Sequence, residues 1–310
     1  MEGASFDPPR QTEIQVRLIT FTKDGATRIG ILEGGEVCDV TAVNPGLPRA
    51  MIDLLESGER GLAAARAAIT TAPRFDVATV ELRAPVAPRK LLALGINYRE
   101  HIAEMKALMP AFVVPDTQVW FNKQVTSVTG PFDPIHKPKV SDFLDYEGEL
   151  AIVIGKRCRH VSESEAASVI AGYTICNDVS VRDWQMATPT QTMGKSFDTH
   201  APLGPAIVTS DEVGDPQDLR VRVWVNGEPR QDFSTSDMVF SCFKQIEHLS
   251  KAFTLEPGDV ITTGTSVGNG VLRVPPVLLK AGDLVRVEID HIGAIENRVV
   301  DEPEAALFQR

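Results

Sequence analysis

The sequence has few cysteines, few aromatic residues and no long apolar run. None of its four cysteines lies in a CxxC metal motif. A chain of 310 residues does not need disulfides for stability, so we expect reduced thiols and a cytoplasmic location. The longest apolar runs, such as 91–96 and 150–155, are too short to span a bilayer. Residues 1–15 lack the apolar segment of a signal peptide, and we expect a loose tail there.

Basic residues are also scarce relative to acidic ones. Lysine and arginine number 31 against 42 aspartates and glutamates, which gives a formal net charge of −11. Such a chain does not attract phosphates at long range, so we expect neither nucleic acid nor a membrane as a partner. A local site for a small acidic ligand remains possible. The hydrophobic fraction of 43% and the charged fraction of 24% are typical of a folded globular protein.

Short alternating segments predict a mainly β protein with a few helices, of the α+β class. Strand patterns are interrupted by only a few helical ones, and the strands do not alternate regularly with long helices, which argues against a Rossmann fold or a barrel. We expect a small β-rich N-terminal domain over 16–80, a Pro- and Ala-rich joint over 70–88 and a larger domain over 86–310. The expected helices cover 51–68, 98–108, 162–170 and 241–252.

The most informative motif is the acidic run from Asp145 to Glu149, which leads into a buried strand. Residues two apart in a strand point to the same face, so Glu147 and Glu149 should project together. Two carboxylates held this close repel each other unless a cation lies between them, and oxygen ligands suit Mg²⁺, Mn²⁺ or Ca²⁺. The alternative is a pair of acids on a solvated strand face.

A second acidic position follows the apolar run 171–176. A carboxylate at the end of a buried strand is costly without a partner, so Asp178 is a candidate ligand. Arg182 and Gln185 follow it and would face the same pocket if residues 180–185 form a turn or helix. The alternative is that Asp178 caps a helix and pairs with Arg182.

Three further segments carry groups suited to binding or catalysis. Lys195 lies in a loop bounded by Gly and Pro, where it would hold a substrate carboxylate or oppose the acids, unless it is a surface lysine. The Gly-rich loop around Thr265 offers backbone amides to an anion. His101 and Glu104 are three residues apart on a predicted helix, so they form either a proton-abstracting pair or a surface ion pair.

Together these segments resemble the fumarylacetoacetate hydrolase family over about residues 88–300. The resemblance rests on collinear motifs, namely NYREH, FNKQVTSVTGP, DYEGELAIVIGK, AGYTICNDVSVRDWQ, GKSFDTHAPLGP, VNGEPRQ, LEPGDVITTGT and IGAIENRV. It implies a β-roll or β-sandwich catalytic domain, a small N-terminal domain and a homodimer.

The resemblance also implies roles for individual residues. Glu147, Glu149 and Asp178 match divalent metal ligands, for Mg²⁺ or Mn²⁺ with Ca²⁺ as an alternative. His101 and Glu104 match the water-activating pair on a lid, and Lys195 matches the lysine beside the metal. The positions that match substrate-binding residues are Arg182, Gln185, Lys123 and Thr265. The further aspartate ligand of fumarylacetoacetase has no counterpart in LLALGINYREH, which argues against that substrate.

From this resemblance we expect a hydrolase that cleaves the C–C bond of a 2,4-dioxo acid such as an acylpyruvate, in catabolism of aromatic compounds. Water activated by His101 and Glu104 would attack the C4 carbonyl, with Lys195 and Gln185 beside the developing oxyanion. Decarboxylation of an oxaloacetate-like acid or isomerisation of an enol would use the same site without an attacking water. A metal-dependent binding protein without turnover is the remaining alternative.

Overall fold

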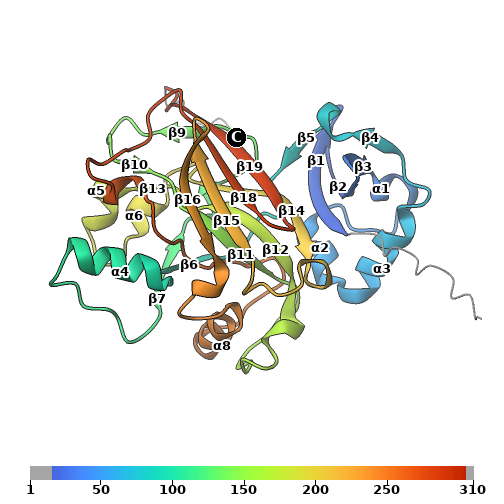
Figure 1. The fold of residues 1–310 in the computed structure, drawn as a ribbon. Helices are drawn as coiled ribbons and strands as arrows, with labels where there is room; N and C mark the ends of the chain where they lie inside the picture. Colours follow the sequence, from blue (N-terminus) through green and yellow to red (C-terminus); the bar gives the residue numbers. More distant parts are fainter. Residues whose placement is uncertain (1–15, 305–310) are drawn as a thin grey trace, which may run out of the picture.

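The computed structural model describes residues 16–304 of the chain. The tail predicted for residues 1–15 lies outside the described residues. Strands dominate the described part, and the helices lie at its ends and edges (Figure 1). This arrangement confirms the predicted class, mainly β with a few helices.

The N-terminal strands form the hairpins that the alternating pattern predicted. Strand β1 (Arg17–Lys23) pairs along its full length with β2 (Ala26–Glu33), and β3 (Glu36–Cys38) follows a turn at Gly34 and Gly35. Both turn glycines have positive φ angles, +57° and +88°, which glycine adopts without steric cost. The short helix α1 (Val40–Val43) comes next.

The helix predicted over 51–68 is two helices. Helix α2 (Met51–Glu56) ends at Ser57, and α3 (Gly58–Ala68) begins at the next residue. Gly58 has a φ of +60°, so the backbone leaves the helical path there although the apolar spacing continues. Buried residues of both helices pack on the N-terminal sheet.

The stretch expected as a joint contains two short strands. Strand β4 (Arg74–Asp76) pairs with β3, and β5 (Glu81–Arg83) pairs with β1. These hydrogen bonds make 70–83 part of the N-terminal sheet, where its Pro and Ala content had predicted a linker. The division into domains over 16–80 and 86–310 stays a prediction.

A large sheet runs through the molecule and includes the N-terminal strands, because β1 pairs with β14. The strand order is β4-β3-β2-β1-β14-β12-β11-β17-β6-β7. The bounds of its remaining strands are β14 (Ala201–Thr209), β12 (Ile170–Asn177), β11 (Gly148–Ile154), β17 (Val260–Thr262), β6 (Leu91–Gly95), β7 (Val119–Lys123) and β8 (Val128–Thr129), which pairs with β14.

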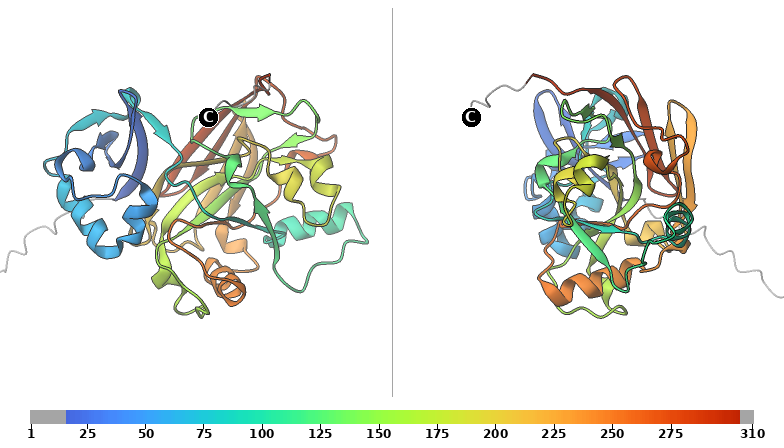
Figure 2. Two further views of the ribbon diagram at one scale, coloured as in Figure 1. Left: turned by 180° about the vertical axis from the view of Figure 1, so that it is seen from behind. Right: turned by 90° about the vertical axis from the view of Figure 1, so that its left-hand side faces the viewer.

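A second sheet packs on the face of the first (Figures 1 and 2). Its turn between β15 and β16 is the Asn226–Gly227 dipeptide, a sequence favoured in two-residue hairpins, with φ angles of +54° and +79°. Its strands in order are β16 (Glu228–Ser234), β15 (Arg220–Val225), β18 (Leu284–Ile289), β19 (Gly293–Asp301) and β9 (Ile135–Lys137). Two further short strands, β10 (Leu144–Asp145) and β13 (Ser180–Val181), pair with each other.

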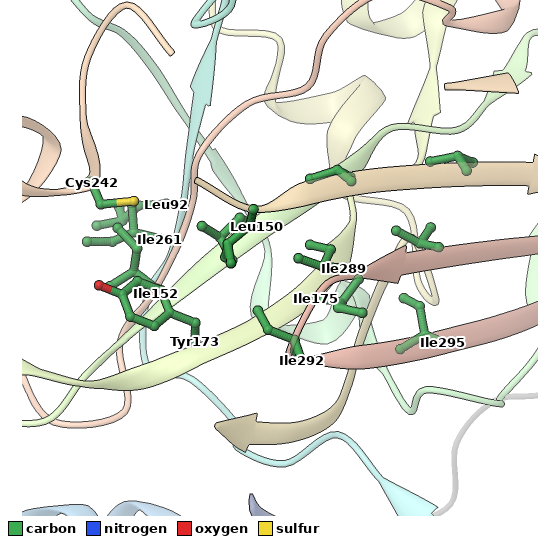
Figure 3. Packing of buried hydrophobic residues seen from close by; sticks show 14 of the residues in the cluster. Leu92, Leu150, Ile152, Tyr173, Ile175, Cys242, Ile261, Ile289, Ile292 and Ile295 are labelled. Atoms are coloured by element: carbon green, nitrogen blue, oxygen red, sulfur yellow. The ribbon is translucent and has the colours of Figure 1, made fainter. Parts of the chain in front are cut away.

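The main hydrophobic core lies between the two sheets. Ile175 of β12 lies beside Ile289 of the other sheet, whereas Ile152 and Tyr173 lie near Ile261 and Cys242 at one end of the core (Figure 3). The alternate residues of β11, Ala151 and Val153, pack in a separate core with the N-terminal elements. Burial on both faces explains why this strand is apolar without interruption over residues 150–154.

One predicted helix is wrong. Residues 162–170 form turns and a short 3₁₀ segment (Ala166–Val169), and β12 begins at Ile170. Only half of a capping box forms here, because the Ser162 backbone N–H donates to Glu165 Oε2 at 3.1 Å while the Ser162 hydroxyl donates to the same oxygen at 2.5 Å. Helix formation stops because Ile170 pairs with Ile154 of β11, so tertiary pairing overrides the local helical pattern.

The other predicted helices are present. Helix α4 (Arg99–Leu108) and α8 (Cys242–Ala252) match the predicted ranges closely, and Ser241 caps α8 by accepting from the Lys244 N–H at 3.2 Å. The remaining helices are α5 (Arg182–Met186), α6 (Thr192–Lys195) and α7 (Ser210–Val213). None of the described helices has the length and apolar character needed to cross a membrane.

Candidate functional site

Three carboxylates converge where β11 and β12 meet. The two strands are antiparallel, with Gly148 opposite Asn177, and the Asp178 N–H donates to the Glu147 carbonyl at 2.8 Å. Glu147 and Asp178 are therefore cross-strand neighbours, and Glu149 lies on the same face two residues further along. All three are buried, and each offers an oxygen within 4.8 Å of the others. The solvated strand face is thereby excluded.

Glu149 lacks a cationic partner among residues 16–304. Its Oε2 accepts from the Gly264 N–H at 2.8 Å, in the loop after β17. Gly264 has a φ of +91°, and a Cβ there would lie 2.9 Å from the Leu94 carbonyl oxygen, so glycine is required for this approach. Burial raises the pKa of the Glu149 carboxyl well above its usual value, and Asp178 and Glu147 raise it further.

Lys195 joins two of the acids. Its Nζ lies 2.5 Å from Glu147 Oε2 and 2.7 Å from Asp178 Oδ2, and 4.9 Å from the centre of the Phe121 ring. Burial by itself would lower the pKa of Lys195, but Asp178 and Glu147 outweigh burial and raise it. The burial of Lys195 excludes the surface alternative, and its two carboxylate partners favour the protonated form.

Lys123 lies among the acids. This residue of β7 is fully buried and donates to Asp178 Oδ1 at 2.6 Å and to the Val179 carbonyl at 3.2 Å. The resemblance had matched it to a substrate-binding position. In the structure its ammonium is bound to a candidate metal ligand, which the sequence did not indicate because the two residues are 55 positions apart.

Arg182 opens α5 and contacts acids on both sides. Its Nη1 donates to Glu147 Oε1 at 2.7 Å and to Gln185 Oε1 at 3.0 Å, while Nε and Nη2 donate to Asp145 Oδ2 at 2.9 and 2.7 Å. Burial opposes ionisation of Glu147, but Arg182 and Lys195 hold its pKa down at about 2. The sequence did predict that Asp178, Arg182 and Gln185 face one region.

Asp145 is the residue that sequence reasoning missed. It is fully buried and lies two residues before Glu147, so the same alternation that linked Glu147 to Glu149 would have included it. Its carboxylate also accepts from the backbone N–H groups of Gly270 and Val271, at 2.9 and 3.1 Å.

Thr265 binds the backbone of β11 next to the candidate metal ligands. Its hydroxyl donates to the Gly148 carbonyl at 2.9 Å and accepts from Gln231 Nε2 at 2.9 Å. Gln231 Oε1 accepts in turn from the Gly148 N–H at 3.0 Å. These bonds fix the backbone between Glu147 and Glu149, a different placement from the substrate contact that the resemblance implied.

The proposed proton-transfer pair is formed. His101 is buried on α4, and its Nδ1 lies 3.2 Å from Glu104 Oε2. Asn97, just before α4, donates to the Thr263 carbonyl at 2.8 Å, next to the Gly264 amide that binds Glu149. Helix α4 thus begins beside the acid-binding loop, and it lies at the same end of the molecule as α5 and α6 (Figures 1 and 2).

The charges of the buried acid cluster fit a divalent cation. The cluster consists of four carboxylates and three cationic side chains, namely Asp145, Glu147, Glu149 and Asp178 with Lys123, Arg182 and Lys195. One carboxylate is in excess, and the converging oxygens of Glu147, Glu149 and Asp178 are the hard ligands that Mg²⁺ and Mn²⁺ prefer. The identity of the ion is part of the proposal below.

Comparison with known proteins confirms the resemblance seen in the sequence. Residues 90–300 match the family described as fumarylacetoacetate hydrolase, C-terminal. The chain is 43% identical over 295 residues to the mitochondrial oxaloacetate tautomerase fahd2 of Xenopus laevis, covering 93% of this chain and 91% of that protein. It is also 43% identical over 271 residues to the mitochondrial oxaloacetate tautomerase FAHD2A of Homo sapiens, covering 86% and 85%. The predicted cytoplasmic location therefore stays a prediction.

Solved structures give the same result. The fumarylacetoacetate hydrolase of Exiguobacterium antarcticum superposes with a TM-score of 0.80 at 37% identity, covering 93% of this chain and all of that one. The maleylpyruvate hydrolase of Sphingobium sp. SYK-6, solved with manganese(II) and pyruvate, has a TM-score of 0.78 at 34% identity, with the same coverage.

Proposed function

This chain belongs to the fumarylacetoacetate hydrolase family, and we propose that it interconverts the enol and keto forms of oxaloacetate. The observation that carries the proposal is the buried triad of Glu147, Glu149 and Asp178, which suits a cation able to chelate a 2-oxo acid. Oxaloacetate is chosen among such acids because relatives 41 to 43% identical to this chain are named oxaloacetate tautomerases.

The triad residues would hold the divalent cation, which we propose to be Mg²⁺ or Mn²⁺. When bound, it supplies Lewis acidity that polarises the C2 oxygen of a 2-oxo acid and makes the C3 protons more acidic. Lys195 adds a fixed positive charge, because its raised pKa keeps it protonated beside Glu147 and Asp178. The homodimer also remains part of the proposal.

His101 is the group that we assign to proton transfer. Its Nδ1 faces Glu104, so Nε2 is the nitrogen available to exchange a proton with the substrate. In the direction from enol to keto, the enol oxygen loses its proton and C3 gains one, so no other reactant is needed.

Cleavage of a 2,4-dioxo acid is the second candidate. The observation that favours it is the same His101–Glu104 pair, because an imidazole held by a carboxylate also activates water. Water would attack the C4 carbonyl, and the C3–C4 bond would break to release an acid and pyruvate. Maleylpyruvate hydrolase, at 34% identity, is a relative named for such a substrate.

The two candidates are separated by measuring product formation. The protein is assayed with enol-oxaloacetate and with acylpyruvates, each with Mg²⁺, Mn²⁺ or EDTA. Loss of the ultraviolet enol band without release of pyruvate or CO₂, above the spontaneous rate, supports the tautomerase. Release of pyruvate from acylpyruvates alone would replace it by the hydrolase, and release of CO₂ from oxaloacetate would replace it by a decarboxylase. Full activity in EDTA would exclude both metal-dependent proposals.

A histidine variant tests the assigned proton carrier. We expect His101→Gln to lower kcat by about 10²–10⁴-fold, the usual share of a general base or acid. His248→Gln is the matched control, because His248 is exposed on α8, and it should leave kcat unchanged. Unchanged turnover in His101→Gln would show that another group transfers the proton.

A further inference from the structure

Asp145 and Arg182 form a buried ion pair, and Arg182 also contacts the candidate metal ligand Glu147. Arg182 uses Nε and Nη2 on Asp145, and it uses Nη1 on Glu147 and on Gln185. The guanidinium is therefore held from three sides. The match of Arg182 to a substrate-binding position stays a prediction beside these protein contacts.

The carboxylate of Asp145 is itself fixed by the backbone. The N–H groups of Gly270 and Val271 donate to its two oxygens at 2.9 and 3.1 Å, and the Tyr146 N–H donates at 3.0 Å. A Cβ at Gly270 would lie 2.6 Å from Asp145 Oδ1, so the loop approaches this carboxylate as closely as glycine allows. Together with the two hydrogen bonds from Arg182, these three backbone bonds leave the Asp145 carboxylate little freedom to move.

We propose that Asp145 is a positioning residue that sets the affinity of the triad for its cation. It does so through Arg182, whose position it fixes between Asp145 and Glu147. With Asp145 charged, the guanidinium is shared between two carboxylates, and Glu147 remains able to bind a cation. Without that charge, Glu147 is the remaining carboxylate partner of Arg182 and is drawn more strongly toward it. This inference rests on the proposed function only in requiring that the triad binds a divalent cation.

The test is a titration of Asp145→Asn with Mn²⁺ alone, followed by electron paramagnetic resonance. Asparagine keeps the shape of the side chain and one of the two oxygens that accept from the loop amides and Arg182, but it removes the charge. We expect Mn²⁺ binding to weaken by about 10- to 100-fold, as for other groups that orient metal ligands. At saturating Mn²⁺ the kcat should stay within about threefold of the unchanged protein, because Asp145 does not touch the substrate.

Asp232→Asn is the matched control. Asp232 also binds an arginine, Arg220, through two N–H groups, but this pair is exposed on β15 and β16. The control should bind Mn²⁺ like the unchanged protein. Normal Mn²⁺ affinity in folded Asp145→Asn would overturn the proposal. If kcat were lost at the same time, Asp145 would instead be a substrate contact.

Arg182→Lys tests the same inference if Asp145→Asn does not fold. Lysine keeps the positive charge but cannot bridge Asp145, Glu147 and Gln185 together. We therefore expect Mn²⁺ binding to weaken by about 10- to 100-fold, as in Asp145→Asn. Unchanged Mn²⁺ affinity in this variant would refute the proposal. The titration contains no substrate, so its outcome is independent of whether the enzyme is a tautomerase or a hydrolase.

Discussion

Two sets of ion pairs in this protein have similar chemistry and opposite surroundings. The buried acid cluster has four carboxylates and three cations, and so does the outer charge face, which consists of Arg220, Arg222 and Arg286 with Asp232, Glu288, Asp290 and Glu296. Nitrogen–oxygen distances are 2.5–2.7 Å in the pairs of the cluster, and on the face they are 2.5 Å for Arg220–Asp232, 2.8 Å for Arg286–Glu288 and 3.0 Å for Arg222–Glu288. Side chains of the cluster are at most 9% exposed, whereas those of the face are 29–52% exposed.

Burial, rather than the number of charges, decides whether the excess carboxylate is simply solvated or needs a proton or a cation. On the outer charge face water solvates the extra acid and screens the pairs, so each pair contributes little. In the buried acid cluster the extra acid is Glu149, and it must keep a proton or receive a cation. A surplus that is harmless on the surface is therefore, in the interior, the basis of the metal site that we propose.

The largest difference between the two regions should appear when a cation is removed. Lys123→Met leaves the buried Asp178 with one fewer cationic partner, so we expect a loss of about 3–5 kcal/mol in the free energy of unfolding. Urea unfolding in the presence of EDTA measures it. Lys251→Met is the control, because Lys251 pairs with Glu247 on the exposed part of α8, and it should cost less than about 0.5 kcal/mol. Equal losses in the two variants would contradict the comparison.

Glu149→Gln should separate function from stability. The amide removes the excess charge and one metal ligand, so we expect Mn²⁺ binding to weaken by more than about 100-fold, beyond the effect of an outer-shell change. In EDTA at neutral pH the variant should be more stable than the unchanged protein. The neutral amide does not ionise when the chain unfolds, so the variant loses the free energy by which ionisation of Glu149 favours the unfolded chain. Metal titration and urea unfolding measure the two effects.

The free energy of unfolding without metal should depend on pH through Glu149. The pKa of Glu149 is raised in the folded protein, so between its ordinary value and the raised one the unfolded chain ionises while the folded one keeps its proton. Stability without metal therefore falls as pH rises through this window, by at most about 1.4 kcal/mol per pH unit from this group. The advantage of Glu149→Gln should vanish near pH 4, and an advantage that persists there would contradict the assigned cause.

The smallest effect is expected on the outer charge face. Arg286→Met keeps most of the side-chain length but removes the pairs with Glu288 and Glu296, so we expect a loss below about 1 kcal/mol. The loss should shrink when the salt concentration is raised, because these groups are exposed. Unfolding curves at low and high NaCl measure both, and a salt-independent loss of several kcal/mol would mean that this face is as constrained as the buried acid cluster.

Much of the fold was predictable because local pattern and final structure agree. The hairpin at Asn226 and Gly227 and helix α8 follow from turn chemistry, capping and apolar spacing. The pattern failed over 162–170, where β12 pairs with β11, and at Gly58, where one positive φ divides a helix. In both places a feature outside the local periodicity decides the structure.

The candidate site was predictable to a similar extent. Alternation placed Glu147 and Glu149 on one face, and the helical spacing of His101 and Glu104 predicted the contact that forms. The carboxylate partners of Lys123 and Arg182 were not indicated, because they are set by the packing of several elements, and Arg182 pairs with Asp145 and Glu147 where the sequence had offered Asp178. Asp145 was overlooked although its spacing carried the same signal as that of Glu147.

Short-range sequence pattern was enough to predict the mainly β class, the helix over 241–252 and the shared strand face of Glu147 and Glu149, because these depend on neighbours a few residues away. Only the tertiary structure decided that Glu147 lies opposite Asp178, that Lys123 reaches an acid 55 residues away, and that Gly264 binds one 115 residues away. Such contacts depend on the register between strands and on the burial of the groups they bring together, and neither quantity is encoded in any short segment.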